Sequence, residues 1–412
     1  METQSTWLAR PQEHLGTAGL IVLLVGTSML MPLSLDMYTP AVPHMAEHLS
    51  TTTAMVNLTL VGYNFFFAVG LLIFGPLSDR RGRRPVLLGG LAFYVAGSLA
   101  CALAPSIEVL VVARIVQSLG AGAADAMTNA VVKDAFMEGK RQLAISFIQL
   151  MFIIGPVIAP IVGAWIVIAL DWWATFWILT AAGVLFSFLA LAFEESLPVS
   201  ERYVSSEKGE TARQFAAVLR VPAFTLPLLV LTLPNFGFMA YVSVASFICE
   251  SYFGLSELAY GMYYAIATFV TVLGPFAWEF ASRHMEARTF ITAKIGAAVA
   301  AGAALLVFGH LAPWLFCAAF AVFAIVEASL RPLSTNILLS KFRDAGGTTA
   351  SAINFTSTVQ GSLGMLLVGA LGTDYVSALG WTILGSMIVA ALGWQAVLCR
   401  YPHTAEIRAW DE

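Results

Sequence analysis

The chain has 412 residues, of which 59% are hydrophobic and 11% are charged, and its formal net charge is −4. Average soluble domains carry about 25% charged residues, so this composition excludes a soluble globular protein and indicates an integral membrane protein. The four cysteines, Cys101, Cys249, Cys317 and Cys399, form no C-x-x-C pair, so they predict neither a disulfide framework nor a metal site.

Apolar segments long enough to span a bilayer, at about 20 residues each, recur along the whole chain. We predict twelve such spans, at residues 16–38, 54–78, 85–104, 107–132, 142–169, 173–193, 223–249, 258–281, 288–309, 311–335, 347–372 and 376–399. The first has no small-residue cleavage site after it, so we interpret it as an uncleaved span rather than a signal peptide.

The longest polar stretch separates the sixth predicted span from the seventh. It divides the chain into an N-terminal six-helix bundle at 1–193, a cytoplasmic linker at 194–222 and a C-terminal six-helix bundle at 223–412. Lysines and arginines fall in the linker and in every second connection, and the alternate connections contain none. This segregation predicts that both termini lie in the cytoplasm.

The stretch GPLSDRRGRRP, Gly75 to Pro85, fills the short connection between the second and third predicted spans. Its four arginines and one aspartate cannot cross a bilayer cheaply, so they mark a loop on the cytoplasmic side. The glycines allow close backbone approach and a tight turn, and Pro85 can open the following helix. The stretch resembles the signature loop between helices 2 and 3 of the major facilitator superfamily. An ordinary positively charged loop with no further role is the alternative.

This resemblance implies an all-α integral membrane fold, with twelve transmembrane helices in two pseudo-symmetric six-helix bundles. It also implies a conformational latch formed by residues of the loop and the end of the fourth span, namely Gly75, Asp79, Arg80, Gly82, Arg83, Arg84 and Asp134. The second half contains a counterpart, GPFAWEFASRH, Gly274 to His284, which retains the Gly-Pro pair but has Trp278 at the aspartate position and lacks the arginine cluster.

An ionisable side chain at mid-span costs at least about 2.5 to 3.5 kcal/mol, so each one present is expected to face an interior cavity and a partner. The candidates are Asp36, Arg114, Asp125, Glu327 and Arg331. Asp36 lies in LMPLSLDMYTPAVP, Leu30 to Pro43. A carboxyl in a largely apolar pocket can take up a proton near neutral pH, as proton coupling requires.

The segment around Asp36 resembles the first helix of the bicyclomycin-resistance-like drug:proton antiporters, which implies export of drugs in exchange for protons. An aspartate that only caps or orients the outer end of the helix is the alternative. The stretch RIVQSLGAGAA, which opens with Arg114, resembles the family's fourth-helix motif, with Ser118 where the family usually has glycine. The resemblance implies that Arg114 exchanges partners with the protonatable carboxylate.

Asp125 follows Arg114 by 11 residues, about 1100 degrees of helix rotation, so the two project from nearly the same face but cannot pair directly. It matches no position of the family motif, and it either faces a cavity or contacts the signature arginines at the helix end. Asp134, in VVKDAF, fits a family position and is expected to make such a contact.

The fifth span carries GPVIAPIVGAW, which resembles the antiporter motif of the drug exporters. Its members are Gly155, Pro156, Pro160 and Gly163. Each proline removes a backbone donor and the glycines allow tight packing, so this helix can bend against its partners. A packing helix without a gating function is the alternative.

Glu327 and Arg331 are four residues apart, so they can form an ion pair along one helix. Such a pair could provide a second proton site, hold a charged part of the substrate, or only stabilise the second half. The stretch from Phe236 to Gly254 resembles the family's seventh helix, whose residues line the drug pocket. Our candidate substrate-binding residues are Tyr38, Tyr63, Asn64, Tyr241, Tyr263, Arg331 and Asn354.

The chain has no G-x-x-x-x-G-K-[ST] phosphate loop, so ATP is not the expected energy source. We therefore expect a monomeric, proton-driven drug exporter of a bacterial inner membrane, not an enzyme, with no cofactor or metal. Its partners would be a small-molecule substrate, protons and the lipid bilayer, with no nucleic acid. The alternatives are a proton-coupled carrier of a polar metabolite and a membrane sensor that transports nothing.

Overall fold

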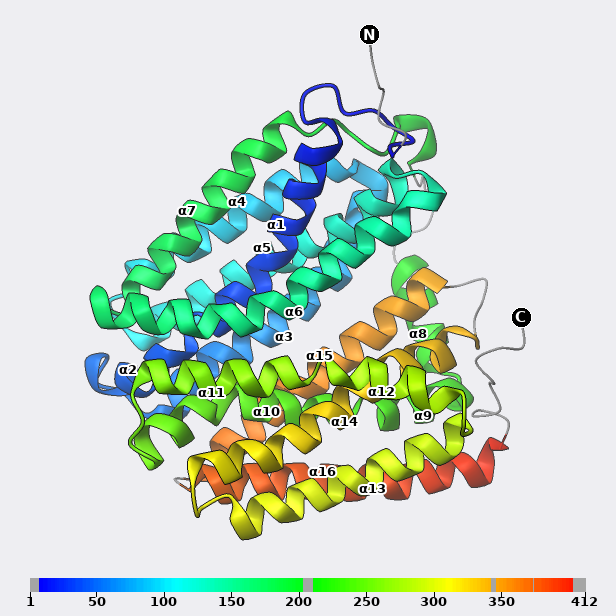
Figure 1. Cartoon of the computed structure of the whole chain (residues 1–412). Helices are drawn as coiled ribbons and strands as arrows, with labels where there is room; N and C mark the ends of the chain where they lie inside the picture. The colour runs from blue at the N-terminus through cyan, green and yellow to red at the C-terminus, as the bar shows by residue number, and fades with distance from the viewer. Residues whose placement is uncertain (1–6, 203–209, 342–345, 373, 403–412) are drawn as a thin grey trace. The chain divides into compact units, whose positions relative to one another are not determined.

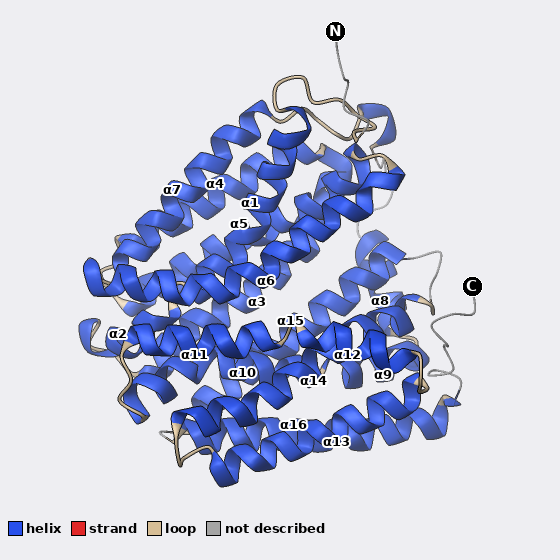
Figure 2. Ribbon diagram, viewed as in Figure 1, coloured by secondary structure: helices blue, strands red, loops and turns tan. Residues whose placement is uncertain are grey.

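The computed structural model describes residues 7–202, 210–341, 346–372 and 374–402. These residues form helices and no strand, as Figure 2 shows. The chain separates into two compact units, Met1–Lys208 and Gly209–Glu412. Each unit is a bundle of long helices, which agrees with the predicted all-α membrane fold (Figure 1).

Seven α-helices form the described part of the N-terminal unit. They are α1 (Gly16–Asp36), α2 (Val42–His48), α3 (Thr53–Arg81), α4 (Arg83–Ala102), α5 (Ile107–Ala135), α6 (Glu138–Ala169) and α7 (Trp173–Ala192), with short 3₁₀ turns η1 (Thr39–Ala41) and η2 (Val199–Glu201). Helix α5 packs against α3, α4 and α1, while α6 packs along α1. Helix α5 is therefore the central element on which the polar residues of this unit converge.

The C-terminal unit begins with the helix α8 (Glu210–Leu219). It continues with α9 (Pro222–Thr232), α10 (Pro234–Ser246), η3 (Phe247–Tyr252), α11 (Glu257–Val270), α12 (Leu273–Ser282), α13 (Ala287–Phe308), α14 (Pro313–Leu339), α15 (Gly346–Ala370) and α16 (Tyr375–Arg400). Helix α10 packs against α15 and α16, and α14 packs against α12 and α13.

Eleven helical segments within the described ranges are long and apolar enough to cross a membrane, and each matches a predicted span. Helix α15 (Gly346–Ala370) corresponds to the remaining predicted span, 347–372, and ends two residues before it. The structure extends several boundaries beyond the apolar runs. The seventh span, for example, continues through α9, α10 and η3 to Tyr252 rather than ending at residue 249.

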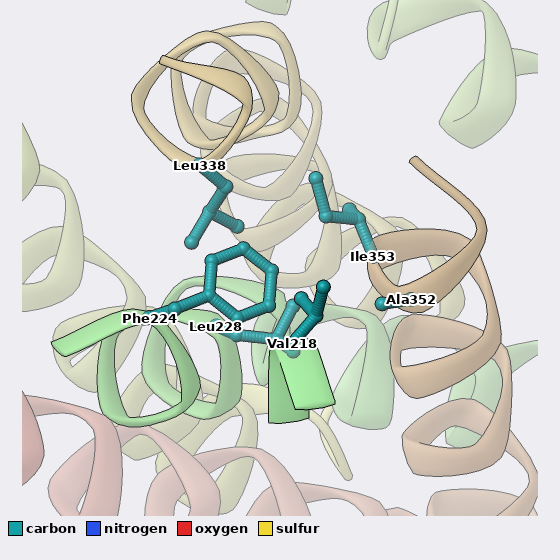
Figure 3. Packing of buried hydrophobic residues seen from close by; sticks show 6 residues of the cluster. All are labelled: Val218, Phe224, Leu228, Leu338, Ala352 and Ile353. Atoms are coloured by element: carbon teal, nitrogen blue, oxygen red, sulfur yellow. The ribbon is translucent and has the colours of Figure 1, made fainter. Parts of the chain in front are cut away.

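The range that the sequence assigns to a linker, 194–222, is not featureless. Residues 194–202 contact the N-terminal unit, and α8 belongs to the C-terminal unit. Figure 3 shows Val218 of α8 against Phe224 and Leu228 of α9, together with Leu338 of α14 and residues of α15. This apolar cluster fixes the end of α8 to the second bundle.

Close backbone contact brings α5 against its neighbours. A Cβ at Gly122 would collide with the carbonyl oxygen of Phe67 on α3, and one at Gly120 would collide with the backbone of Tyr94 on α4. Small residues at these positions allow the three helices to approach closely. The approach brings polar side chains of α1, α3 and α4 within reach of Arg114.

Candidate functional site

Arg114 lies at the centre of the N-terminal unit and is completely buried. Its Nη1 donates hydrogen bonds to the carbonyl oxygen of Ser34, at 2.9 Å, and to Oε1 of Gln117, at 2.8 Å. Its guanidinium carbon lies 4.2 Å from the ring centroid of Tyr63 and 4.9 Å from that of Tyr38. Aromatic faces attract a cation, so these rings replace part of the lost hydration.

A ring of hydrogen bonds extends from Arg114 to α4 and back to α1. Nε2 of Gln117 donates to Oγ of Ser98, at 2.8 Å, and that hydroxyl donates to the carbonyl oxygen of Tyr94, at 2.7 Å. The Tyr94 hydroxyl lies 2.7 Å from Oγ of Ser34, whose carbonyl accepts from Arg114. The ring fixes the position of Arg114 without using a carboxylate.

Two of the donor groups of Arg114 find no hydrogen-bond partner in the part of the chain that the structure describes. These are Nε and Nη2, and both are buried. A buried donor that lacks an acceptor costs about 1 to 3 kcal/mol, and more when the group is charged. The guanidinium is therefore held in a position where it can accept an anionic partner.

Asp36 is the last residue of α1 and is also buried. Its backbone carbonyl accepts a hydrogen bond from Oγ1 of Thr39, at 2.8 Å, which fixes the chain where α1 ends. Tyr63 lies within electrostatic range of both Asp36 and Arg114. The carboxyl and the guanidinium are thus placed near the same aromatic side chain.

The antiporter motif packs directly against this end of α1. A Cβ at Gly163 of α6 would collide with the carbonyl group of Met37, and one at Gly155 would lie 3.4 Å from Cγ of Pro32. Helix α6 is continuous through Pro156 and Pro160, just as α1 is continuous through Pro32. The motif therefore supplies close contact with the Asp36 segment and leaves both helices unbroken.

Asp125 is buried on α5, three turns after Arg114. Its backbone carbonyl accepts from Nδ2 of Asn129, at 3.2 Å, and within the described residues its carboxylate has neither a hydrogen bond nor an ion pair. The neighbouring Thr128 bonds to Thr27 of α1, at 3.0 Å, so this face of α5 lies against α1. The structure does not place Asp125 against the signature arginines.

Arg83 holds the signature loop together. Its Nη1 lies 2.6 Å from Oδ1 of Asp79 and 2.6 Å from Oγ of Ser78, both on α3. Its Nε lies 2.8 Å from Oδ2 of Asp134 on α5. One buried guanidinium therefore joins α3, α4 and α5.

The stretch itself is almost entirely helical, and the connection between the two spans is shorter than the predicted gap between residues 78 and 85. Helix α3 continues through Gly75 to Arg81 and α4 begins at Arg83, so Gly82 alone joins them, with φ of 99°. A Cβ at Gly82 would collide with the carboxylate of Glu195, and the strained backbone favours glycine. The tight turn that the glycine predicts is therefore present, but it is one residue long.

Glu195, which the sequence analysis did not single out, caps this turn. Its carboxylate accepts from the backbone N–H of Arg83, at 2.8 Å, and of Arg84, at 3.3 Å, and it lies 3.6 Å from Arg202. An anion at the start of α4 is favoured by the helix dipole. Nη2 of Arg84 donates to the carbonyl oxygen of Leu191, whereas Arg80 is exposed.

Residues near the N-terminus contact the same segment. Arg10 pairs with Glu201 at 2.6 Å, and Gln12 and Glu194 exchange hydrogen bonds through side chain and backbone. The hydrogen bond from His14 holds the pKa of the Glu194 carboxyl below its usual value. Residues 194–202 are thereby fixed to the N-terminal unit at several points.

In the C-terminal unit, Glu327 and Arg331 form the ion pair that their spacing predicts. Nη2 of Arg331 lies 2.6 Å and its Nε 3.1 Å from Oε1 of Glu327. The Glu327 side chain is 5% exposed and that of Arg331 is 63% exposed. The buried carboxylate is therefore neutralised by a guanidinium whose outer part remains available to another partner.

The other predicted substrate residues lie in different environments. Tyr241 is buried in an aromatic stack, with its ring centroid 3.5 Å from that of Phe320 and 5.7 Å from that of Tyr264. Asn64 is buried, Tyr263 is half-buried and Asn354 is exposed. Tyr38 and Tyr63 belong to the Arg114 site, where Oη of Tyr38 lies 3.0 Å from Oγ1 of Thr59. The structure places both tyrosine rings against Arg114, and Tyr63 also lies within electrostatic range of Asp36.

Sequence reasoning missed Glu250, a buried carboxyl in η3. The predicted seventh span ended one residue earlier, so Glu250 was assigned to a connection and was not counted among the ionisable groups within spans. A longer hydropathy window could have included it. No group of three or more histidine, cysteine, aspartate or glutamate side chains that could hold a metal ion occurs among the described residues.

Comparison with known proteins gives a consistent result. The sequence profile of the Major Facilitator Superfamily matches residues 24–365. The chain is similar to a chloramphenicol resistance protein of Pseudomonas aeruginosa, at 31% identity over 382 residues, which cover 88% of this chain and 84% of that protein. It is also similar to multidrug resistance protein MdtL of Escherichia coli, at 25% identity over 371 residues, which cover 88% and 90%.

Among solved structures, the fold is similar to that of the peptide transporter POT in complex with sulfate, with a TM-score of 0.75. The two share 17% sequence identity, and the match covers 97% of this chain and 98% of the other. This likeness concerns the arrangement of the helices alone.

Proposed function

Because the chain belongs to the major facilitator superfamily, we propose that it exports drugs or other small amphipathic molecules across the inner membrane in exchange for protons. The export proceeds by alternating access of the two six-helix bundles. The drug class follows from the relatives, whose names are chloramphenicol resistance protein and multidrug resistance protein MdtL. The bicyclomycin-resistance-like branch and cytoplasmic termini are parts of the same proposal.

The proposal of proton coupling rests on the burial of Arg114 and on its unsatisfied hydrogen-bond donors. Arg114 is completely buried and has two unsatisfied donors, while Asp36 is buried near the same tyrosine. A buried carboxylate is stabilised by a nearby guanidinium and loses that stabilisation when it takes up a proton. Protonation of Asp36 can therefore change how strongly α1 is attracted to α5.

The close contact between α6 and α1 gives this change a mechanical consequence. Gly155 and Gly163 hold α6 against Pro32 and Met37, so movement of the Asp36 segment is transmitted to α6 by direct packing. Packed interfaces respond to a shift by moving between discrete arrangements. Asp36 is thus the main proton carrier of the proposal, Arg114 is its electrostatic partner, and Asp125 is a second buried carboxyl on the same helix.

The test uses the full-length protein in proteoliposomes, with chloramphenicol as the first substrate and an imposed pH gradient. Wild type should move the drug against its gradient, and Asp36→Asn should reduce this transport to the level of protein-free vesicles because Asn cannot carry a proton. Glu108→Gln is the matched control, since Glu108 is an exposed carboxyl at the start of α5. Gradient-driven transport by Asp36→Asn at the wild-type rate would remove Asp36 from the coupling role.

A second candidate function is proton-coupled transport of a polar metabolite. The observation that favours it is the exposed guanidinium of Arg331, which can bind a carboxylate or phosphate group. The same vesicles separate the two functions. A metabolite symporter would accumulate a charged substrate when that substrate and the higher proton concentration are on the same side of the membrane. Arg331→Gln would then reduce transport of the charged substrate without changing transport of a neutral drug.

A further inference from the structure

The N-terminal segment, residues 7–14, precedes α1 and runs across the ends of other helices of its unit. It first pairs with the connection between α5 and α6. The backbone N–H of Ala9 donates to the carbonyl oxygen of Ala135, at 2.8 Å, and the N–H of Met137 donates to the carbonyl oxygen of Trp7, at 3.0 Å. An isolated antiparallel β-bridge joins the two segments here. The N-terminal segment is therefore bonded to the end of α5 through its backbone.

The same segment also binds residues 194–202, which follow α7. The guanidinium of Arg10 donates to the carbonyl oxygen of Ser196. Gln12 is buried and exchanges two hydrogen bonds with the backbone of Glu194. Its Nε2 donates to the carbonyl oxygen, at 3.2 Å, and its Oε1 accepts from the N–H, at 2.8 Å. One short segment thus joins two connections that are far apart in the sequence.

The residues that this segment binds are the immediate neighbours of two carboxylates. Asp134, which lies 2.8 Å from Nε of Arg83, directly precedes Ala135. Glu195, whose carboxylate accepts from the first backbone N–H groups of α4, stands between the two residues that bind Gln12 and Arg10. The segment therefore holds the backbone beside both anions that stabilise the turn between α3 and α4.

Both carboxylates need such support because each lies at a helix end. Asp134 is the last residue but one of α5, and Glu195 follows the final residue of α7, Ala192. Helix ends open locally at a low cost in free energy. Contacts from a third segment restrict the backbone at these positions, so less conformational entropy is lost when the carboxylates bind the arginine side chain and the N–H groups. A single residue, Gly82, joins α3 to α4, so a shift of either anion reaches the turn directly.

We propose that residues 7–14 act as a strap that positions Asp134 and Glu195 on the signature turn, and that Arg10 and Gln12 are its positioning residues. The inference rests on the proposed transport cycle and on the latch role that the resemblance implies for the signature loop. It adds the segment that sets how readily this latch changes conformation. Both positioning residues precede α1, so their loss should change the rate of the conformational step rather than the binding of drug.

Hydrogen–deuterium exchange of the full-length protein in lipid nanodiscs tests the positioning directly. Arg10→Ala and Gln12→Ala should accelerate exchange at the backbone N–H groups of Arg83 and Arg84 by about three- to tenfold, the change that loss of one hydrogen bond produces. Glu13→Gln is the matched control, because its side chain is exposed and its bond to the segment after α7 uses the backbone N–H. Unchanged exchange at the start of α4 in both alanine variants would overturn the proposal.

A double-variant cycle separates positioning from a general loosening of the unit. Arg10→Ala should accelerate exchange in the wild-type background but add little to Glu195→Ala, because that variant lacks the anion that the strap positions. Arg10→Lys should restore slow exchange, since an ammonium group can still donate to the carbonyl oxygen of Ser196. Fully additive effects of Arg10→Ala and Glu195→Ala would show that Arg10 does not act through Glu195 and would refute its positioning role.

Transport in proteoliposomes tests the link to the cycle. Per amount of folded protein, Arg10→Ala and Gln12→Ala should lower the maximum rate of gradient-driven chloramphenicol export several-fold at unchanged KM, whereas Glu13→Gln should keep the wild-type rate. A strap that only stabilises the fold would lower the amount of folded protein and leave the rate per folded molecule unchanged, which would contradict a role in the latch. A wild type that does not respond to the gradient would instead refute the proposed function, and the exchange measurement would still decide whether the strap positions the signature turn.

Discussion

The second half contains a counterpart of the signature loop. Both stretches, Gly75 to Pro85 and Gly274 to His284, begin with a Gly-Pro pair, but they are stabilised by different contacts. In the first loop, Arg83 is buried and joins three helices through Asp79 and Asp134. In the second, Arg283 pairs with Glu279 of its own helix at 3.1 Å, and both side chains are more than half exposed.

This difference shows what the charges contribute beyond the shape of the turn. The aspartate position of the first loop is occupied in the second by Trp278, whose ring centroid lies 4.9 Å from that of Phe290 on α13. The same end of a helix pair is therefore stabilised by ions in one unit and by an aromatic contact in the other. A buried ion pair depends strongly on both partners, whereas an exposed pair contributes little.

Removal of the Arg83 side chain should have the largest effect. Arg83→Ala leaves the carboxylate of Asp134, which is 13% exposed, without its guanidinium. The free energy of unfolding of the N-terminal unit should therefore fall by about 3 to 5 kcal/mol. Chemical unfolding in mixed micelles measures this loss. The double variant Arg83→Ala/Asp134→Asn should recover part of it, and a cost of less than about 1 kcal/mol for the single variant would contradict a cross-linking role.

The turn residue should give the next largest effect. Gly82→Ala places a Cβ against the carboxylate of Glu195 and at φ of 99°, so it should destabilise the protein by about 1 to 3 kcal/mol. The corresponding Ala281 lies within α12, so Ala281→Gly should cost about 1 kcal/mol or less. The same unfolding assay applies to both. Equal losses of stability for Gly82→Ala and Ala281→Gly would show that the backbone conformation at Gly82 does not require glycine.

The smallest effect is expected for Arg283. Its side chain is 62% exposed and its partner Glu279 is 56% exposed, so Arg283→Ala should change stability by about 0.5 kcal/mol or less. Raising the salt concentration should reduce even this difference, because exposed charges are screened. A loss comparable to that of Arg83→Ala would mean that Arg283 has a partner beyond Glu279.

The candidate site was predictable in part from local sequence. The spacing of Glu327 and Arg331 places them one turn apart, and the structure shows the ion pair. The contact between Asp134 and the signature arginines was expected from a motif, and the distance of 2.8 Å to Arg83 shows it. Both inferences needed only helix geometry or a recognised pattern.

Other features could not be read from the sequence. Glu195 lies over 110 residues after Arg83 and contacts its backbone N–H only because α7 returns the chain to the start of α4. The ring formed by Gln117, Ser98 and Tyr94 likewise needs the rotation of α4 against α5. Each contact depends on the relative orientation of two helices, which no single segment encodes.

The sequence by itself determined that this chain crosses a membrane, where its spans lie, and that few charges remain within them, because hydropathy is a sum over about 20 neighbouring residues. Only the tertiary structure decided which of those charges are paired. Arg83 meets two carboxylates, Arg114 keeps two donors unsatisfied, and Glu250 lies in a π turn. These outcomes depend on helix packing across long sequence distances, where a rotation of one helix replaces one set of neighbours with another.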